Sequence, residues 1–533
     1  MTRRARILAA SALLTLSTAI PAYAGEALDT SSTLSWGPCP EGSGVVARAT
    51  CATFTVPKDY DDPSAGTIEL TMSKIPATGK KKGVIAGNPG GPGGDALGMF
   101  SDPADDDPTS PRVRLPDSIG KDYDLIAVEP RGLTWGTPLN CEPPRTSMMP
   151  AAALYEACES HNPGYTKTVN TANTARDLEE ARKYLGEKTL NLYGVSYGGI
   201  LMSTYATLFP SSTHKVILDS SASPRDWAND MAAKRQRTRQ EAVRAFFSWI
   251  AEQDAKYHLG TTPREVYRSF ASVIRDVYGV APPVRPQPAG RDDVHAVPDD
   301  YAEAAIGLLN TVDSLSWKAG RFIDVMKMYA GLLPVENIGA PTSTAVTSLY
   351  DQKTWPELAQ AVSDAKAKSH HEGSLQEPSR KPGSGDSTDA LTPDMRKQQE
   401  IQQKLVQAMM VQSNAVICNE NATPPDHSKL LPYLGSLVVP GDALEANDNL
   451  IVSGAYCGGW PTNTPFAPVS GHQLTVKPLH LGYDKDTAVS ETGAPDMRDA
   501  RGGELHIYHG YSHGVLIQDA DLAAQTVADY MNE

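Results

Sequence analysis

The stretch Gly194-Val195-Ser196-Tyr197-Gly198 predicts a serine on a sharp turn between a strand and a helix. A β-type run at 190–193 precedes it, and an apolar helical run at 199–209 follows it and stops at Pro210. Because glycine lacks a Cβ atom, glycines two residues before and after the serine permit the close backbone contacts that such a turn requires. Ser196 is therefore our candidate nucleophile. The alternative is an ordinary Gly-rich turn whose serine caps the helix.

Residues 1–24 have the pattern of an export signal. Three arginines precede an apolar stretch from Ile7 to Ile20, and Ala22-Tyr23-Ala24 forms a small-x-small cleavage site. The apolar stretch is too short for a membrane anchor. We therefore expect a cleaved signal peptide and a secreted protein without membrane contact after the signal is removed.

The mature chain is expected to be strongly acidic. Removing the signal takes three of the 48 Lys+Arg and none of the 63 Asp+Glu, which leaves 45 against 63 and a net charge of −18. This balance argues against nucleic-acid and anionic-membrane partners. We expect a soluble monomer.

Six cysteines, an even number in an exported chain, favour disulfides over the alternative of buried free thiols. Of the fifteen pairings that six cysteines allow, we favour the one that joins sequence neighbours. The expected disulfides are Cys39–Cys51, Cys141–Cys158 and Cys418–Cys457. The sequence contains no C-x-x-C pair, no H-E-x-x-H motif and no EF-hand loop, so we expect neither a metal site nor a cofactor.

Short β-type runs alternate with helical patterns in the first half of the chain and again near its end, which indicates a largely parallel sheet. Residues 225–430 differ, because they are charged, often Ala-rich and helical in pattern. Besides the run before Ser196, strands are predicted at 52–57, 67–73, 83–86, 123–128, 215–219, 478–482 and 504–508.

The strand at 83–86 leads into a loop rich in glycine and proline, residues 87–94. Backbone N–H groups in such a loop can stabilise the negative oxygen that forms on an attacked carbonyl, each by roughly 3–4 kcal/mol. Gly91 and Tyr197, the residue after the nucleophile, are our candidate donors. A phosphate-binding loop and a plain flexible loop are the alternatives, although no Gly-Lys-Ser/Thr sequence follows to complete a Walker motif.

Several of these segments resemble the proline-iminopeptidase-type α/β-hydrolases, and within them the secreted tripeptidyl aminopeptidases of actinobacteria. The resemblance is strongest over about 50–225 and 450–520. It implies an α/β-hydrolase fold, with a mostly parallel sheet flanked by helices and an inserted helical cap. We place the core at 25–224 and 431–533 and the cap at 225–430. The matching segments are Gly90-Gly91-Pro92-Gly93, Pro130-Arg131-Gly132, Tyr193 to Gly198, and Leu218-Asp219.

A triad in this fold follows the chain order Ser, Asp, His, with the acid and the base after late strands. A serine hydroxyl needs an imidazole to take its proton, and a buried carboxylate orients that imidazole. Asp484 matches an Asp-x-x-Thr motif of the family, with Asp486 as the alternative. His513, which Gly514 follows, fits the family better than His509.

The resemblance implies a serine exopeptidase that releases tripeptides from free N-termini of peptides through an acyl-enzyme. By the same resemblance, Glu420 is the candidate carboxylate for the substrate ammonium, and Trp460 is a candidate for lining the pocket, with packing as its alternative role. Peptides with a free N-terminus are the expected partners. The alternatives are a proline iminopeptidase or an esterase of the same fold, and a non-catalytic binding protein on a hydrolase scaffold.

Overall fold

The computed structural model describes residues 34–102, 112–142, 150–226, 229–334, 351–372, 392–421, 426–431, 442–461 and 473–533, with a few short pieces between these ranges. The expected signal peptide at 1–24 lies outside the described residues. Within the described part of the chain, no helix is both long enough and apolar enough to cross a bilayer.

The core is an eight-stranded sheet in the order β1-β2-β4-β3-β5-β6-β7-β8. β2 pairs antiparallel with both β1 and β4, and all the other neighbours are parallel. Every predicted strand is confirmed. The strands are β1 Thr50–Pro57, β2 Thr67–Ile75, β3 Gly83–Asn88, β4 Tyr123–Val128, β5 Leu190–Val195, β6 Thr213–Asp219, β7 Leu479–Tyr483 and β8 Glu504–Tyr508.

Helices cover both faces of this sheet, so its central strands are buried on both sides. Along β5, Leu190 and Leu192 pack into one hydrophobic cluster and Tyr193 and Val195 into the other, as the alternation of side chains in a strand requires. The first cluster includes residues of α3 and α4, and the second includes residues of α1 and α16. The flanking helices are α1 Asp117–Asp122, α2 Pro150–His161, α3 Thr171–Tyr184, α4 Tyr197–Leu208, α14 Gly493–Arg501, α15 Val515–Gln518 and α16 Ala520–Asn532.

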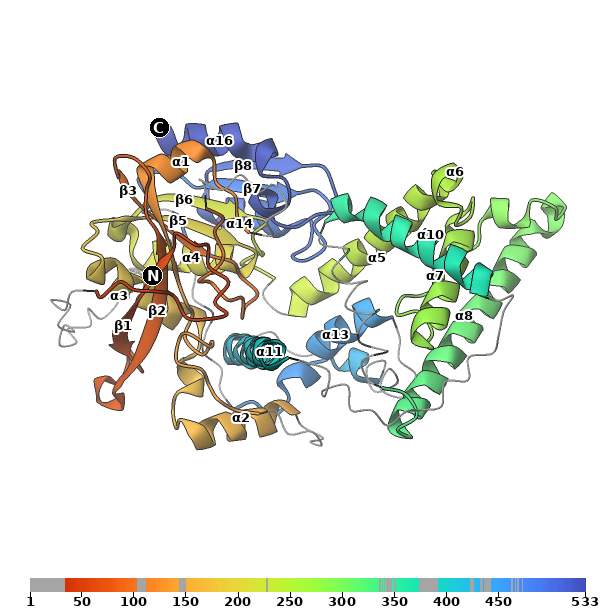
Figure 1. Cartoon of the computed structure of the whole chain (residues 1–533), viewed down its shortest axis with the longest axis horizontal. Helices are drawn as coiled ribbons and strands as arrows, with labels where there is room; N and C mark the ends of the chain where they lie inside the picture. The colour runs from red at the N-terminus through yellow and green to blue at the C-terminus, as the bar shows by residue number, and fades with distance from the viewer. Residues whose placement is uncertain are drawn as a thin grey trace, which may run out of the picture.

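A helical insertion separates β6 from β7 along the chain. Figure 1 shows the sheet at one end of the molecule and most of the inserted helices at the other, with α8 along the outer edge. The aromatic side chains of α5, α7 and α10 form a hydrophobic cluster of their own. The inserted helices are α5 Asn229–Ala251, α6 Asp254–Tyr257, α7 Pro263–Tyr278, α8 Asp299–Tyr329, α10 Trp355–Glu372, α11 Pro393–Glu420 and α13 Ala443–Val452.

The insertion does not end at residue 430, where we expected it to. α13 packs against α5, and the chain rejoins the sheet only at Leu479. Conversely, α11 lies against the sheet domain, because Val411, Ala415 and Val416 belong to the first hydrophobic cluster of the core. α11 therefore packs on the core of the sheet domain although it belongs to the insertion.

All three expected disulfides are confirmed: Cys39–Cys51, Cys141–Cys158 and Cys418–Cys457. The third joins the end of α11 to the 3₁₀ turn Ala455–Cys457, which follows α13. It therefore fixes the C-terminal end of α11.

A fully buried ion pair holds the antiparallel edge of the sheet to α3. Two guanidinium nitrogens of Arg131 donate to the Asp177 carboxylate over 2.6 and 2.7 Å, and the two side chains are 0% and 1% exposed. The Tyr60 hydroxyl donates to the same carboxylate over 2.9 Å. Replacing Asp177 by alanine would therefore leave a buried cation without its partner.

We expect Asp177→Ala to lower the free energy of unfolding by about 3–5 kcal/mol, because an unpaired buried charge is costly. The exposed pair Lys397–Glu41 supplies the control, since its side chains are 59% and 57% exposed. Lys397→Ala should cost less than about 1 kcal/mol. Urea denaturation measures both variants, and equal losses would contradict the prediction.

Candidate active site

Ser196 occupies the turn between β5 and α4, with φ 59° and ψ −126°. A positive φ is disfavoured for a residue with a side chain and stores roughly 1–3 kcal/mol of strain. A Cβ atom on Gly194 would collide with the carbonyl of Gly198, and one on Gly198 would collide with the carbonyl of Asn88. The two glycines are therefore required by the close contacts of the turn, as the sequence predicts.

His513 forms a buried pair with Asp486. The imidazole Nδ1 lies 2.8 and 3.0 Å from the two carboxylate oxygens, and the side chains are 9% and 2% exposed. The carboxylate also accepts the N–H groups of Ala488 and Val489, which fix its orientation. Burial lowers the pKa of His513, but the nearby Asp486 carboxylate outweighs this effect and raises that pKa above its ordinary value. The pair can hold the ring with Nε2 facing away from the carboxylate.

The prediction that Asp484 orients His513 is wrong. Its carboxylate instead lies 2.7 Å from Nδ1 of His509, whose side chain is 87% exposed. The Asp484 N–H still donates to the Tyr508 carbonyl and so continues the β7–β8 ladder at the surface. Asp486 lies beyond the ladder, in the turn that folds inward. The alternative carboxylate is therefore the partner of His513, and His509 belongs to a separate surface pair.

Asp219 connects the serine turn to the segment that carries His513. Its backbone carbonyl accepts the Ser196 N–H over 3.0 Å. Its buried carboxylate accepts the N–H groups of Val515 and Leu516, each over 2.8 Å. The neighbouring Ser220 hydroxyl accepts the Gly514 N–H over 2.9 Å. The end of β6 thus brings Ser196 and the residues after His513 to the same edge of the sheet.

We did not assign Asp219 a role from the sequence, although a signal for it existed. The residue ends a buried apolar strand, Lys215-Val216-Ile217-Leu218-Asp219, where a carboxylate needs partners. Burial raises the pKa of this carboxyl. It accepts the Tyr193 hydroxyl and two main-chain N–H groups, and the latter are 296 and 297 residues away in sequence, which a sequence pattern does not reveal.

The glycine-rich loop after β3 lies directly against the serine turn. A Cβ atom on Gly90 would be 3.0 Å from both the Ser196 Cβ and the Gly198 nitrogen. Gly90 and Gly91 have φ angles of 90° and 110°, which only glycine adopts readily. The backbone of this loop and the first residue of α4, Tyr197, therefore flank the serine.

Glu420 lies buried at the end of α11 and is linked through Thr171 to the side chain of Tyr197. Its carboxylate accepts both the backbone N–H and the hydroxyl of Thr171, and the Thr171 hydroxyl lies 2.6 Å from the Tyr197 hydroxyl. Burial raises the pKa of Glu420 to about 7. The charge of this carboxyl group therefore changes near neutral pH. Thr171 is the one side chain that lies between it and the Tyr197 hydroxyl.

Trp460 packs in the hydrophobic core. Its indole N–H donates to the Asn419 side chain over 2.8 Å, its ring meets that of Tyr155 edge-on at 5.0 Å, and the residue is 9% exposed. The structure therefore supports the alternative, packing role.

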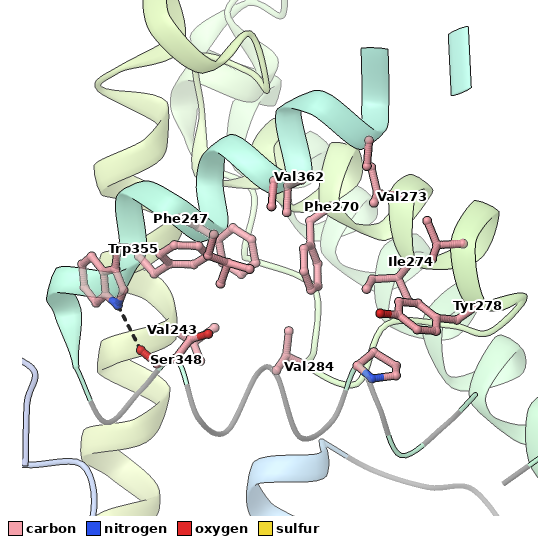
Figure 2. A pocket seen from close by; sticks show the side chains of 16 residues that line it. Val243, Phe247, Phe270, Val273, Ile274, Tyr278, Val284, Ser348, Trp355 and Val362 are labelled. Carbon is pink, nitrogen blue, oxygen red and sulfur yellow. Dashed lines mark hydrogen bonds between the residues drawn. The ribbon is translucent and has the colours of Figure 1, made fainter. Parts of the chain in front are cut away.

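An apolar cavity of about 280 Å³ lies within the insertion, between α5, α7 and α10. Figure 2 shows Phe247, Phe270 and Trp355 turned toward it. No predicted site residue lines this cavity. Among the described residues, no group of three or more His, Cys, Asp or Glu side chains is placed to hold a metal ion.

Comparison with known proteins agrees with the fold. Residues 89–317 match the family of the alpha/beta hydrolase fold. The chain is 32% identical over 261 residues to a tripeptidyl aminopeptidase of Streptomyces coelicolor, covering 44% of this chain and 46% of that protein. It is 26% identical over 302 residues to the serine protease Hip1 of Mycobacterium bovis, covering 51% and 55%.

A third relative, carboxylesterase B of Mycobacterium tuberculosis, is 28% identical over 173 residues, which cover 28% of this chain and 32% of that protein. The chain spans about half the length of the first two relatives and about a third of the length of the third. Taken with the sheet order and the serine turn, the match shows that the chain has the α/β-hydrolase fold.

Proposed function

We propose that the protein is an exported serine exopeptidase that releases tripeptides from the free N-termini of peptides. The proposal rests on two features that lie at the same edge of the sheet. One is Ser196 with its strained backbone, and the other is the buried His513–Asp486 pair. Asp219 joins them, because it binds the segment that follows His513. Similarity to relatives named tripeptidyl aminopeptidase and serine protease supports the peptidase activity. Three disulfides support export, because disulfides persist in oxidising compartments.

In this mechanism the Ser196 oxygen attacks the carbonyl carbon of the third residue while His513 takes the hydroxyl proton. Asp486 holds the Nδ1 proton and stabilises the imidazolium. The backbone N–H groups of Gly91 and Tyr197 bind the oxygen that becomes negative. The imidazolium then protonates the leaving amine, the C–N bond breaks, and an ester joins the tripeptide to Ser196. A water molecule deprotonated by His513 attacks this ester and releases the tripeptide.

Glu420 binds the free amino group of the substrate in this proposal. A buried carboxylate that is linked through Thr171 to Tyr197 is the kind of partner that an ammonium ion needs, because the pair is shielded from water. Its pKa of about 7 means that the carboxyl is largely neutral at pH 6 and largely ionised at pH 8. The substrate amine loses its own charge above about pH 8. Binding should therefore be tightest between these limits.

Glu420→Gln should raise KM for a tripeptide p-nitroanilide at least about tenfold at neutral pH, with a smaller change in kcat, because a binding interaction is lost. The variant should also lose the fall in KM that the wild type shows as the pH rises through about 7. Steady-state kinetics across this range measures both effects. An unchanged KM profile would remove Glu420 from substrate binding.

Thermal unfolding separates binding from a general structural defect. The folded pKa of about 7 exceeds the ordinary value of a glutamate, so the stability that this carboxyl contributes is present at low pH. That stability is lost as the pH rises through about 7. The melting temperature of the wild type minus that of Glu420→Gln should therefore be smaller at pH 8 than at pH 5.

Chromogenic substrates test the reaction class. We expect turnover of tripeptide p-nitroanilides with a free amine, and little turnover of their N-acetylated forms. Faster release from single amino acids would indicate a proline iminopeptidase, and preference for simple esters would indicate an esterase. A fluorophosphonate that fails to label Ser196 would indicate a binding protein without catalysis.

A further inference from the structure

The long helix α8 has one buried face and one exposed apolar face. It lies along the outer edge of the insertion, far from the sheet (Figure 1). Its side chains that pack inward are Ala302, Trp317, Arg321, Asp324 and Val325. The opposite face carries large apolar side chains that the other described residues leave exposed.

These exposed side chains recur every seven residues. Five large ones have exposures between 38% and 75% and form one row: Tyr301, Leu308, Leu315, Phe322 and Tyr329. A second row lies four residues after each of the first four: Ala305, Val312, Ala319 and Met326. Alternating spacings of four and three over four heptads are the pattern of a coiled-coil seam, with the second row at position a and the first at position d. We call these nine residues the α8 seam.

We propose that the α8 seam pairs antiparallel with the α8 seam of a second copy of this chain and forms a two-fold symmetric dimer, in place of the monomer expected from the sequence. Such an interface requires a surface that is complementary to itself, and a heptad seam has this property. The partner is therefore specified by the spacing of the side chains and not by apolar exposure alone.

The sizes of the side chains fit the antiparallel arrangement. When each a position faces a d position of the second copy, Ala305 lies opposite Phe322 and Ala319 lies opposite Leu308. In the middle of the seam, Val312 faces Leu315. Each alanine of the seam thus meets a large side chain, which lets these layers interdigitate.

The charges of α8 favour the same orientation. Asp299 and Asp300 begin the helix, and Lys327 lies in its last turn. Antiparallel pairing places the acidic first turn of one helix beside the last turn of the other, which carries Lys327, whereas parallel pairing would bring the acidic ends together. Opposite charges also complement the dipoles of the two adjacent helix ends.

The exposed area is sufficient for a dimer. The seven large side chains of the seam are 38–75% exposed, which amounts to roughly 800 Å² at about 200 Å² per side chain. This is about the area that each partner buries in a stable interface. It also exceeds the patches of roughly 300–600 Å² that monomers typically expose.

Sedimentation of the full chain between about 1 and 100 µM tests the proposal. We expect the wild type to sediment with twice the chain mass and Leu315→Lys to weaken the dimer at least about 100-fold. Leu315 is chosen because a straight helix drifts by about 20° per heptad, so the middle of the seam makes the closest contact. Leu522→Lys is the matched control, since Leu522 is 48% exposed on α16, away from the insertion (Figure 1).

An unchanged far-UV circular dichroism spectrum and a cooperative unfolding transition show that Leu315→Lys is folded, and Leu308→Lys provides a second seam variant. A wild type that stays monomeric up to about 100 µM would overturn the proposal. The seam would then be covered by another part of this chain or by a different protein. Loss of the dimer in Leu522→Lys but not in the two seam variants would also overturn it.

Cysteine cross-linking fixes the orientation. The six native cysteines are all used in disulfides, so an introduced thiol reacts alone. A mixture of Val312→Cys and Leu315→Cys should form a mixed disulfide dimer on mild oxidation, because these positions face each other. Preferential cross-linking of each variant with itself would contradict the antiparallel arrangement.

Discussion

Replacing Ser196 by alanine is expected to lower kcat by a factor on the order of 10⁴–10⁶ while leaving the fold intact. In the proposed mechanism the hydroxyl oxygen of Ser196 forms the acyl-enzyme, and no other described side chain occupies the turn between β5 and α4. Turnover of a tripeptide p-nitroanilide measures the loss, and circular dichroism with thermal unfolding checks the fold.

Ser196→Gly is the matched variant, because both substitutions remove the hydroxyl but only glycine relieves the positive φ of 59°. Ser196→Gly should therefore be as inactive as Ser196→Ala and more stable by about 1 kcal/mol. Activity that survives in either variant would mean that a different residue is the nucleophile.

Replacing Asp486 by asparagine is expected to lower kcat/KM by a factor on the order of 10⁴, because an amide favours the wrong tautomer of His513 and does not stabilise its imidazolium. The buried Asp486 carboxylate lies 2.8 Å from Nδ1 of His513. Kinetics on the same substrate measures the effect.

The control for this prediction lies two residues away. Asp484→Asn makes the same chemical change in a carboxylate that pairs with the exposed His509, so kcat/KM should change by less than about threefold. A large loss in Asp484→Asn together with near-normal activity in Asp486→Asn would reverse the assignment.

The strands, the serine turn and the disulfides could be predicted because their signals are local. β5 combines a run of buried residues with glycines at fixed distances from Ser196. The cysteines are close in sequence to their partners, so chain proximity alone favours the observed pairs.

The choice between Asp484 and Asp486 could not be made in the same way. Both carboxylates lie at the end of β7, and only the point at which the β7–β8 ladder stops decides which one turns inward. The motif spacing favoured Asp484, but the ladder continues through this residue. Position in the sheet therefore decided the partner of His513.

The C-terminal end of the insertion also could not be predicted from the sequence. α11 and α13 are both helical, yet α11 packs on the sheet and α13 packs on α5. Helical pattern alone does not show which surface a helix contacts. The heptads of α8, in contrast, are visible in the sequence, but their exposure becomes evident only once the helix is placed.

Mass spectrometry of the fragments released from a pool of peptides tests the central claim most directly, with each peptide supplied in free and N-acetylated form. We predict that tripeptides appear in succession from the free N-termini and that the acetylated peptides stay intact. Release of single residues, internal cleavage, or equal digestion of the two forms would contradict the account.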